Sequence, residues 1–185
     1  MKKLFLLAVV LLFCNVAAAQ EFDFKGAVLG MSPSDFDALP DLMPQAMKGK
    51  FSKNTCKMIE DKMECQRTGD NPFGAGNLGA TYYFSKDLHG EIGLFWILLI
   101  AKRAEYSSTL LGLTTKWGEG RTVEFTTTNG LGQEIKGAKT KWSKPGSEIV
   151  LESPCVSVIN MCLTYTHKTR YAEYYSNKKT EESRF

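Results

Sequence analysis

The amino-acid sequence predicts an α+β fold, a two-layer antiparallel sheet with two helices on one face. The first observation behind this prediction is a capped helix start at Ser32, followed by four strand-like segments. The second is an amphipathic helical segment over residues 102–117, followed by four more strand-like segments. The repeated order suggests a tandem α-ββββ repeat of one unit. We therefore expect one sheet whose other face is free to meet a partner or solvent.

The first predicted helix begins within the sequence LGMSPSDF. Ser32 is placed to cap it, Pro33 suits the first helical position, and Asp35 stands three residues after the cap. Pro40 interrupts the pattern and another proline follows at position 44. Because proline breaks a helix interior, this helix is predicted to be short and to end near residues 41–43.

Four strands are predicted after this helix, at residues 51–58, 62–68, 80–85 and 91–101. The last of them contains IGLFWILLIA, which is apolar throughout. Such a run is typical of a central strand that is covered on both faces.

The second predicted helix has apolar residues at positions i, i+4, i+7 and i+11, namely Tyr106, Leu110, Leu113 and Trp117. Gly118 provides its stop. Four further strands are predicted at residues 121–128, 135–142, 148–152 and 162–171. The polar sequence SNKKTEESRF is expected to form a frayed C-terminal tail over residues 176–185.

Residues 1–19 carry the three features of a signal peptide: two lysines after the first methionine, a short apolar run and a final Ala-Ala-Ala. The apolar run, residues 4–13, is about half of the roughly 20 residues that a membrane-spanning helix needs. We therefore expect cleavage near Ala19, a periplasmic or secreted protein and no stable membrane anchor. A lipoprotein signal at Cys14 is the alternative, but Phe13 stands where that signal requires a small residue.

Removal of residues 1–19 leaves 166 residues with a net charge of +1. A chain of this length can bury roughly 70% of its unfolded surface in one core. We therefore expect a single α+β domain over residues 20–175. The near-neutral charge makes nucleic acid an unexpected partner, because binding to its phosphates depends on basic surfaces.

Four cysteines follow residue 19, an even number in a chain predicted to reach an oxidising compartment. Of the three possible disulfide connectivities we favour the local one, in which Cys56 pairs with Cys65 and Cys155 pairs with Cys162, because each pair is close in sequence. Cys56 and Cys65 would face each other across a hairpin that turns at residues 60–61. The spacings differ from the C-x2-C of zinc sites, so no metal ligand is assigned.

No catalytic or cofactor-binding residue is predicted, and no cofactor is expected. Residues 74–79, GAGNLG, match G-x-G-x-x-G, but a strand-like segment follows where a dinucleotide site requires a helix. The motifs G-x-S-x-G and H-E-x-x-H do not occur. His89 and His167 stand alone, one in a predicted turn and the other in a predicted strand.

Aromatic side chains are the best lead to a binding surface, since aromatic anchors commonly dominate protein binding. Trp96 and Trp117 are assigned to the core, the first in the central strand and the second at the end of a helical stripe. Trp142 and the tyrosines of residues 171–175 are expected to be more exposed. The candidate partner-binding residues are Trp142, Tyr165, Tyr171 and Tyr175.

Several short features resemble small exported bacterial proteins of uncharacterised function: the pattern G-x-x-L-G-M-S-x-x-x-F over residues 26–36, the Lys116-Trp-Gly helix end, the strand with Trp142 and the closing Leu163-Thr-Tyr strand. The order of elements is also similar to the tandem repeats of beta-lactamase inhibitory protein and to the single repeat of small outer-membrane assembly lipoproteins. The resemblance implies a non-enzymatic protein-binding role and carries over no contact residue.

These observations favour an exported protein-binding module that uses the helix-free sheet face, either an inhibitor of a secreted hydrolase or an envelope assembly factor. Its partner is then another protein in the envelope or outside the cell. One alternative is a periplasmic carrier with an apolar ligand between helices and sheet, for which an enclosed apolar cavity is required. Another is a hydrolase with two carboxylates roughly 5 to 10 Å apart in a cleft.

Overall fold

The computed structural model describes residues 22–42, 53–70 and 79–182. These residues form one sheet of eight antiparallel strands, a two-stranded sheet and three α-helices. The predicted α+β class is confirmed. The predicted signal peptide, residues 1–19, lies outside the described residues. So do residues 74–78 of the sequence GAGNLG.

The first half begins with the small hairpin β1 (Asp23–Phe24) and β2 (Ala27–Val28), followed by helix α1 (Pro33–Ala38). Four strands of the large sheet follow, β3 (Asn54–Ile59), β4 (Lys62–Arg67), β5 (Thr81–Lys86) and β6 (Ile92–Lys102). The Ser32 hydroxyl accepts a hydrogen bond from the Asp35 backbone N–H at 3.1 Å. The predicted cap of the first helix is therefore confirmed.

The second half repeats the helix and the four strands, with the 3-10 helix η2 (Arg103–Glu105) in place of the small hairpin before helix α2 (Tyr106–Trp117). Its strands are β7 (Arg121–Thr128), β8 (Glu134–Ser143), β9 (Ser147–Ser153) and β10 (Asn160–His167). Helix α2 ends at Gly118, which has a φ of +80° that favours glycine, and whose N–H donates to the Thr114 carbonyl at 2.9 Å. All eight predicted strands are present, with shifted ends.

The order of strands in the sheet is β3-β4-β5-β6-β10-β9-β8-β7. The last strand of each half lies in the middle, where β6 and β10 pair from Lys102 opposite Asn160 to Trp96 opposite Thr166. The first strands of the halves, β3 and β7, form the two edges. This symmetrical order is the one expected of a tandem repeat.

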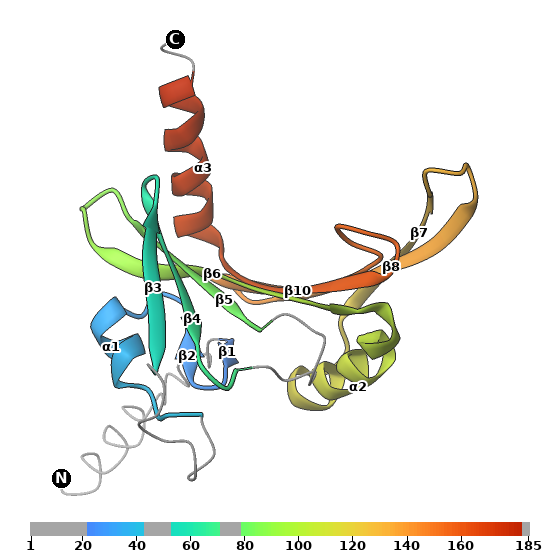
Figure 1. Cartoon of the computed structure of the whole chain (residues 1–185), viewed down its shortest axis with the longest axis horizontal. Coiled ribbons are helices and arrows are strands. Elements are labelled where there is room, and N and C mark those ends of the chain that lie inside the picture. Colours follow the sequence, from blue (N-terminus) through green and yellow to red (C-terminus); the bar gives the residue numbers. More distant parts are fainter. Residues whose placement is uncertain (1–21, 43–52, 71–78, 183–185) are drawn as a thin grey trace, which may run out of the picture.

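Both predicted helices, α1 and α2, cover the same face of the sheet, which we call the core face (Figure 1). Phe36 of α1 packs on Tyr82 and Phe84 of β5, with ring centroids 4.7 and 5.3 Å apart. Leu113 of α2 belongs to the same buried cluster. Side chains of the central strands complete this core: Ile97, Leu99, Ile149, Leu151 and Met161.

A third helix, α3 (Lys168–Glu182), occupies the region where the sequence predicted the end of a strand and then a polar tail. Strand β10 ends at His167, four residues earlier than expected. Tyr174 of α3 is buried against Phe95, with ring centroids 5.0 Å apart. The tyrosines at positions 171, 174 and 175 have the spacing of one helix face. Tyrosine by itself favours a strand, but in a helix these side chains can cover Phe95, and this burial favours the helix.

Helix α3 rises from one end of the sheet and the β7–β8 hairpin curls upward at the other end, both on the face opposite α1 and α2 (Figure 1). We call this the open face. Strands β6, β10 and β9 form its floor between the two projections. The molecule therefore has one helix-covered face and one concave face that α3 covers at one end.

Two disulfides are present, and the predicted pairing is confirmed. Cys56 and Cys65 lie directly opposite each other on β3 and β4, and Cys155 joins Cys162 across the β9–β10 loop. Disulfides of this kind indicate a protein outside the cytoplasm. In the described part of the chain, no helix has the length and apolar character needed to cross a membrane.

Candidate functional site: the concave open face

The central strand β6 presents apolar side chains to both faces of the sheet. Ile97 and Leu99 are fully buried on the core face. Trp96, Leu98 and Ile100 alternate with them on the open face and are only partly buried. We call these three residues the β6 stripe. The sequence predicted a strand that is covered on both faces, so this exposure is the unexpected property of the sheet.

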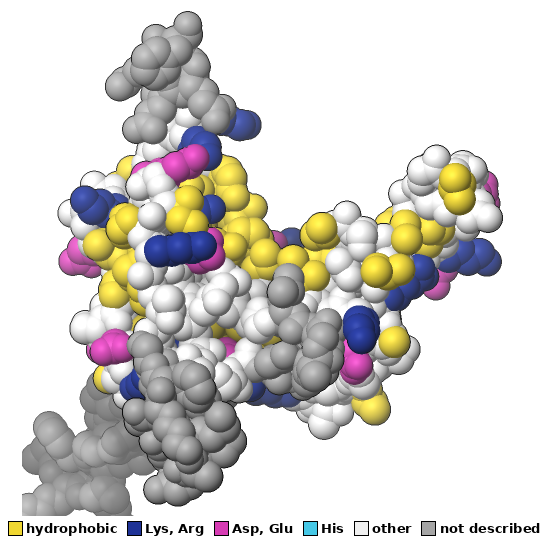
Figure 2. All heavy atoms as spheres, in the orientation of Figure 1, with side chains coloured by type: hydrophobic (Ala, Val, Ile, Leu, Met, Phe, Trp, Pro, Cys, Tyr) yellow, Lys and Arg dark blue, Asp and Glu magenta, His cyan; other side chains and the backbone are white. Residues whose placement is uncertain are grey.

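A hollow of about 400 Å³ opens to solvent at the centre of the open face. We call it the central hollow, and its lining residues are Trp96, Lys139, Glu148, Val150, Glu152, Thr164, Thr166, Lys168 and Tyr171. Figure 2 shows hydrophobic side chains gathered between the base of α3 and the β7–β8 hairpin. Because the central hollow is open, it is not the enclosed apolar cavity that a carrier requires.

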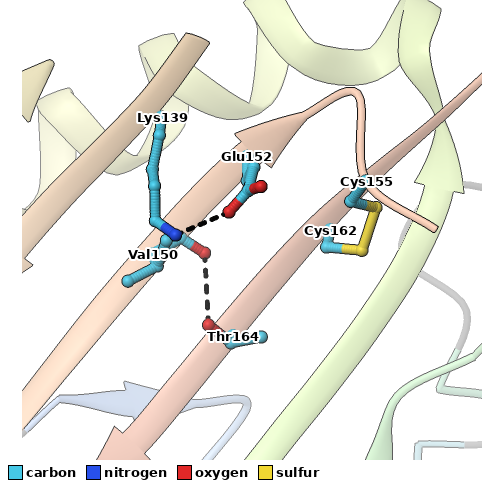
Figure 3. Close-up of a disulfide and its surroundings, with 6 residues drawn as sticks. All are labelled: Lys139, Val150, Glu152, Cys155, Cys162 and Thr164. Carbon is cyan, nitrogen blue, oxygen red and sulfur yellow. Dashed lines mark hydrogen bonds and ion pairs between the residues drawn. A yellow bond between two sulfur atoms is a disulfide. The ribbon is translucent and has the colours of Figure 1, made fainter. Parts of the chain in front are cut away.

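The two carboxylates of the central hollow, Glu148 and Glu152, are each paired with a lysine of β8. Lys139 of β8 lies 2.8 Å from Glu152 of β9, and Lys141 lies 2.5 Å from Glu148. Figure 3 shows the first pair beside Val150, whose carbonyl accepts a hydrogen bond from the Thr164 hydroxyl at 3.5 Å. Opposite charges facing each other across strands stabilise the sheet. The pairs also leave the hollow with a mixed polar and apolar lining.

Four aromatic rings form a continuous group at the α3 end of the open face, and we call Tyr83, Trp96, Tyr171 and Tyr175 the aromatic cluster. Trp96 stacks on Tyr83 with centroids 4.9 Å apart. Tyr171 meets Trp96 edge-on at 6.1 Å and approaches Tyr175 at 4.6 Å. Such pairs gain about 0.5–1.5 kcal/mol beyond their burial. The cluster therefore holds the base of α3 and one wall of the central hollow together.

Two tyrosines of the cluster, Tyr83 and Tyr171, have a raised pKa. Burial raises the pKa of Tyr171 to about 12, with a further contribution from its hydrogen bond with Tyr175. Burial also raises the pKa of Tyr83, and the neighbouring Glu64 carboxylate adds to the effect. Both shifts move the hydroxyls away from neutral pH, so these tyrosines are suited to stacking and hydrogen bonding rather than to proton transfer.

The structure brings two of the four predicted partner-binding residues to the open face. Tyr171 and Tyr175 lie there, whereas Trp142 and Tyr165 are each only 4% exposed and lie in the core. The expectation that Trp142 is exposed is therefore wrong. Its position along β8 places it on the core face. There the indole packs closely on Gly120, since a Cβ atom at position 120 would lie 2.7 Å from it.

The sequence analysis missed two members of the aromatic cluster, Tyr83 and Trp96. Trp96 is the central one, because it contacts both Tyr83 and Tyr171. It was assigned to the core because the run around it is apolar throughout. Alternation along a strand provides the missed signal: if Ile97 and Leu99 serve the helices on one face, then Trp96 must face the other. Since both predicted helices were placed on one face, the tryptophan had no expected cover.

The open face offers aromatic stacking, apolar burial and hydrogen bonding. Among the residues that the structure describes, no group of three or more His, Cys, Asp or Glu side chains is placed to hold a metal ion. Comparisons with protein family models, curated proteins and solved structures found no match for this chain.

Proposed function

We propose that this protein is an exported, non-enzymatic binding module that holds a partner protein in its concave open face. An inhibitor of a secreted hydrolase and an envelope assembly factor are both members of this class. The β6 stripe carries the proposal, because Trp96, Leu98 and Ile100 belong to a central strand yet stay partly exposed. Sheets with apolar side chains on both faces are normally covered on both.

The shape of the open face supports this proposal. Helix α3 and the β7–β8 hairpin project on either side of the floor, so a convex segment of a partner would be enclosed from two sides (Figure 1). The floor has the mixed character of a protein interface, with apolar side chains beside paired charges such as Lys139 and Glu152.

The aromatic cluster supports it as well. Tyrosine and tryptophan bury a large area for little loss of conformational entropy, and they are enriched among the residues that dominate binding energy. Tyr175 is 39% exposed and Trp96 is partly exposed. A partner that covers both would extend the stack that Trp96, Tyr83 and Tyr171 have already formed.

Export is part of the proposal. We infer that residues 1–19 direct the chain out of the cytoplasm and are removed near Ala19, which leaves Gln20 as the first residue. The two disulfides support an oxidising destination. The intact mass of the protein recovered from the periplasm or the medium tests this inference. A mass that includes residues 1–19 would contradict it.

The binding role is tested by affinity capture from envelope and culture-supernatant extracts, with residues 20–185 as bait and both disulfides formed. Val150→Glu places a charge in the floor of the central hollow. Leu111→Glu is the matched control, because Leu111 lies on α2 at the other face and is 69% exposed. We expect one protein to be captured by the wild type and by the control and lost by Val150→Glu.

A purified partner should then bind Val150→Glu at least about tenfold more weakly than the wild type, which corresponds to roughly 1.4 kcal/mol. Equal binding by all three proteins would place the contact elsewhere and reject the open face. Absence of any specific partner would count against the binding module, and native mass spectrometry for a retained small molecule would then examine the carrier alternative.

A further inference from the structure

Positive charge gathers on the open face at the end where β8 leads into β9. Arg121 of β7 lies opposite Lys141 of β8, and Lys141 lies opposite Val150 of β9. Residues that are paired in this way share a face of the sheet. Because neighbouring strands are about 4.8 Å apart, the backbone of Arg121 lies about 10 Å from that of Val150. Both cations therefore stand beside the floor of the central hollow.

Lys168, the first residue of α3, adds a third cation at this end. It lines the central hollow, and its ammonium donates a hydrogen bond to the Lys144 carbonyl. Since Lys144 follows Lys141 by three residues at the end of β8, the two backbones lie about 10 Å apart. We call Arg121, Lys141 and Lys168 the cationic corner.

The cationic corner holds more positive charge than the neighbouring carboxylates neutralise. Glu148 lies 2.5 Å from Lys141 and pairs with that lysine. Glu152, the other carboxylate of the central hollow, is paired with a different lysine of β8. Within the part of the chain that the structure describes, neither Arg121 nor Lys168 has an ion pair. Two cations of the corner are therefore left without a counter-charge.

This excess charge determines which kind of partner segment the open face can accept. Lys168 is already partly buried, so a partner that covers the central hollow would take its ammonium further out of water. Burial of a charge without a counter-charge is costly. Carboxylates on the partner offset this cost, and complementary charges also speed association. Charge complementarity therefore favours an acidic segment over a neutral or basic one.

We propose that the open face takes an acidic segment of the partner protein, in which an apolar or aromatic anchor is flanked by Asp or Glu. The anchor rests on Val150 and the β6 stripe, and the carboxylates meet Arg121 and Lys168. This inference rests on the proposed function and adds the chemistry of the segment that is bound. A basic or neutral segment with the same anchor binds more weakly, because it covers the two cations without neutralising them.

Selection from a library of short random peptides displayed on phage tests the proposal, with residues 20–185 as the target and both disulfides formed. We expect the selected peptides to be enriched in Asp and Glu next to an aromatic or large aliphatic residue, relative to the starting library. The peptide that binds most tightly is then synthesised, and its affinity is measured by fluorescence anisotropy. Its binding should weaken as the salt concentration rises, because salt screens the attraction between surface charges.

Arg121→Glu should weaken binding of this peptide at least about tenfold. A peptide in which the acidic residue is replaced by Lys should bind Arg121→Glu better than it binds the wild type, because the charges are exchanged. Lys136→Glu is the matched control, since Lys136 is an exposed cation of β8 that lines a different hollow, with Ser107 of α2. It should bind the peptide like the wild type. Circular dichroism verifies that each variant is folded.

The outcomes separate this inference from the proposed function. Selected peptides that lack acidic enrichment but are lost in Val150→Glu would overturn the inference and keep the open face as the binding site. An acidic peptide that binds Arg121→Glu as well as the wild type, or loses as much affinity in Lys136→Glu, would also overturn it. Acidic peptides that bind Val150→Glu normally would reject the open face itself. Recovery of no binding peptide would overturn the inference, while affinity capture still tests the binding role.

Discussion

The Tyr174 hydroxyl donates a hydrogen bond to the Asp61 carboxylate at 3.0 Å and joins the last helix to the β3–β4 turn. The pair Lys178–Glu60, 2.9 Å apart, ties the same helix to the same turn. Helix α3 forms one wall of the open face and carries Tyr171. The turn between the first two strands of the sheet therefore helps to position a wall of the candidate site.

Replacing Tyr174 with phenylalanine keeps the ring against Phe95 and removes the hydrogen bond to Asp61. We expect the free energy of unfolding to fall by about 1 kcal/mol, the usual net value of such a bond. Amide hydrogen exchange in α3 should become faster. Tyr83→Phe is the matched control, because it removes a hydroxyl group outside α3 and keeps the ring stacked on Trp96. Equal losses in both variants would show that the bond to Asp61 is not what holds the helix.

Phe95 is predicted to be a main stabilising contact under α3. It sits where the pairing of β5 with β6 shifts register, and it is 1% exposed. Because Phe95→Ala removes a buried ring, it should lower the free energy of unfolding by about 3–5 kcal/mol. Ile92→Ala in the same strand, where the side chain is 42% exposed, should cost less than about 1 kcal/mol. Urea denaturation measures both, and similar losses would contradict the assigned role.

The two disulfides should contribute similar amounts to stability. Their cysteines are separated by 9 and 7 positions, so the loops that they close are of similar length. In the chain-entropy model each such loop contributes about 2.5 kcal/mol. Cys56→Ala with Cys65→Ala, and Cys155→Ala with Cys162→Ala, should therefore lower the free energy of unfolding by similar amounts. A large loss from one pair alone would mean that native-state contacts, rather than loop entropy, decide the effect.

The sheet was predictable because local patterns determine its strands. Alternation of apolar residues, the turn at residues 60–61 and the glycine after Trp117 each indicate where an element begins or ends. The disulfides were predictable for a similar reason, since Cys56 and Cys65 flank one hairpin. These features depend on residues that are close in sequence, so they need no knowledge of the tertiary structure.

The open face was predictable only in part, because it depends on contacts between distant segments. Helix α3 is stabilised by Phe95 and Asp61, which precede it by many residues, and its tyrosines alone suggest a strand. Whether Trp142 faces the core or the open face depends on how β8 lies over α2, which local sequence does not determine. Trp96 was missed because a continuous apolar run hides the alternation between the two faces.

The start of α3 is predicted to loosen in acid. Arg170 lies 3.1 Å from the Asp87 carboxylate, which also accepts hydrogen bonds from the backbone N–H groups of His89 and Glu91 at 2.9 and 3.0 Å. Partial burial raises the pKa of Asp87, but the two N–H groups and the Arg170 cation outweigh it and lower the pKa below its usual 3.8. The carboxyl is thus more acidic in the folded state than in the unfolded state.

A pKa that is lowered on folding stabilises the protein fully above the unfolded value and loses this effect as the pH falls through the folded value. We therefore expect amide exchange in α3 of the wild type, relative to its intrinsic rate, to increase below about pH 4. Asp87→Asn should be less stable at neutral pH and should show a smaller further loss in acid, because its side chain cannot be protonated. Urea denaturation at a series of pH values measures both effects. If the wild type and Asp87→Asn lose stability in parallel below pH 4, then Asp87 is not the group that couples α3 to pH. Glu60, whose pKa is lowered by Lys178, then becomes the next residue to replace.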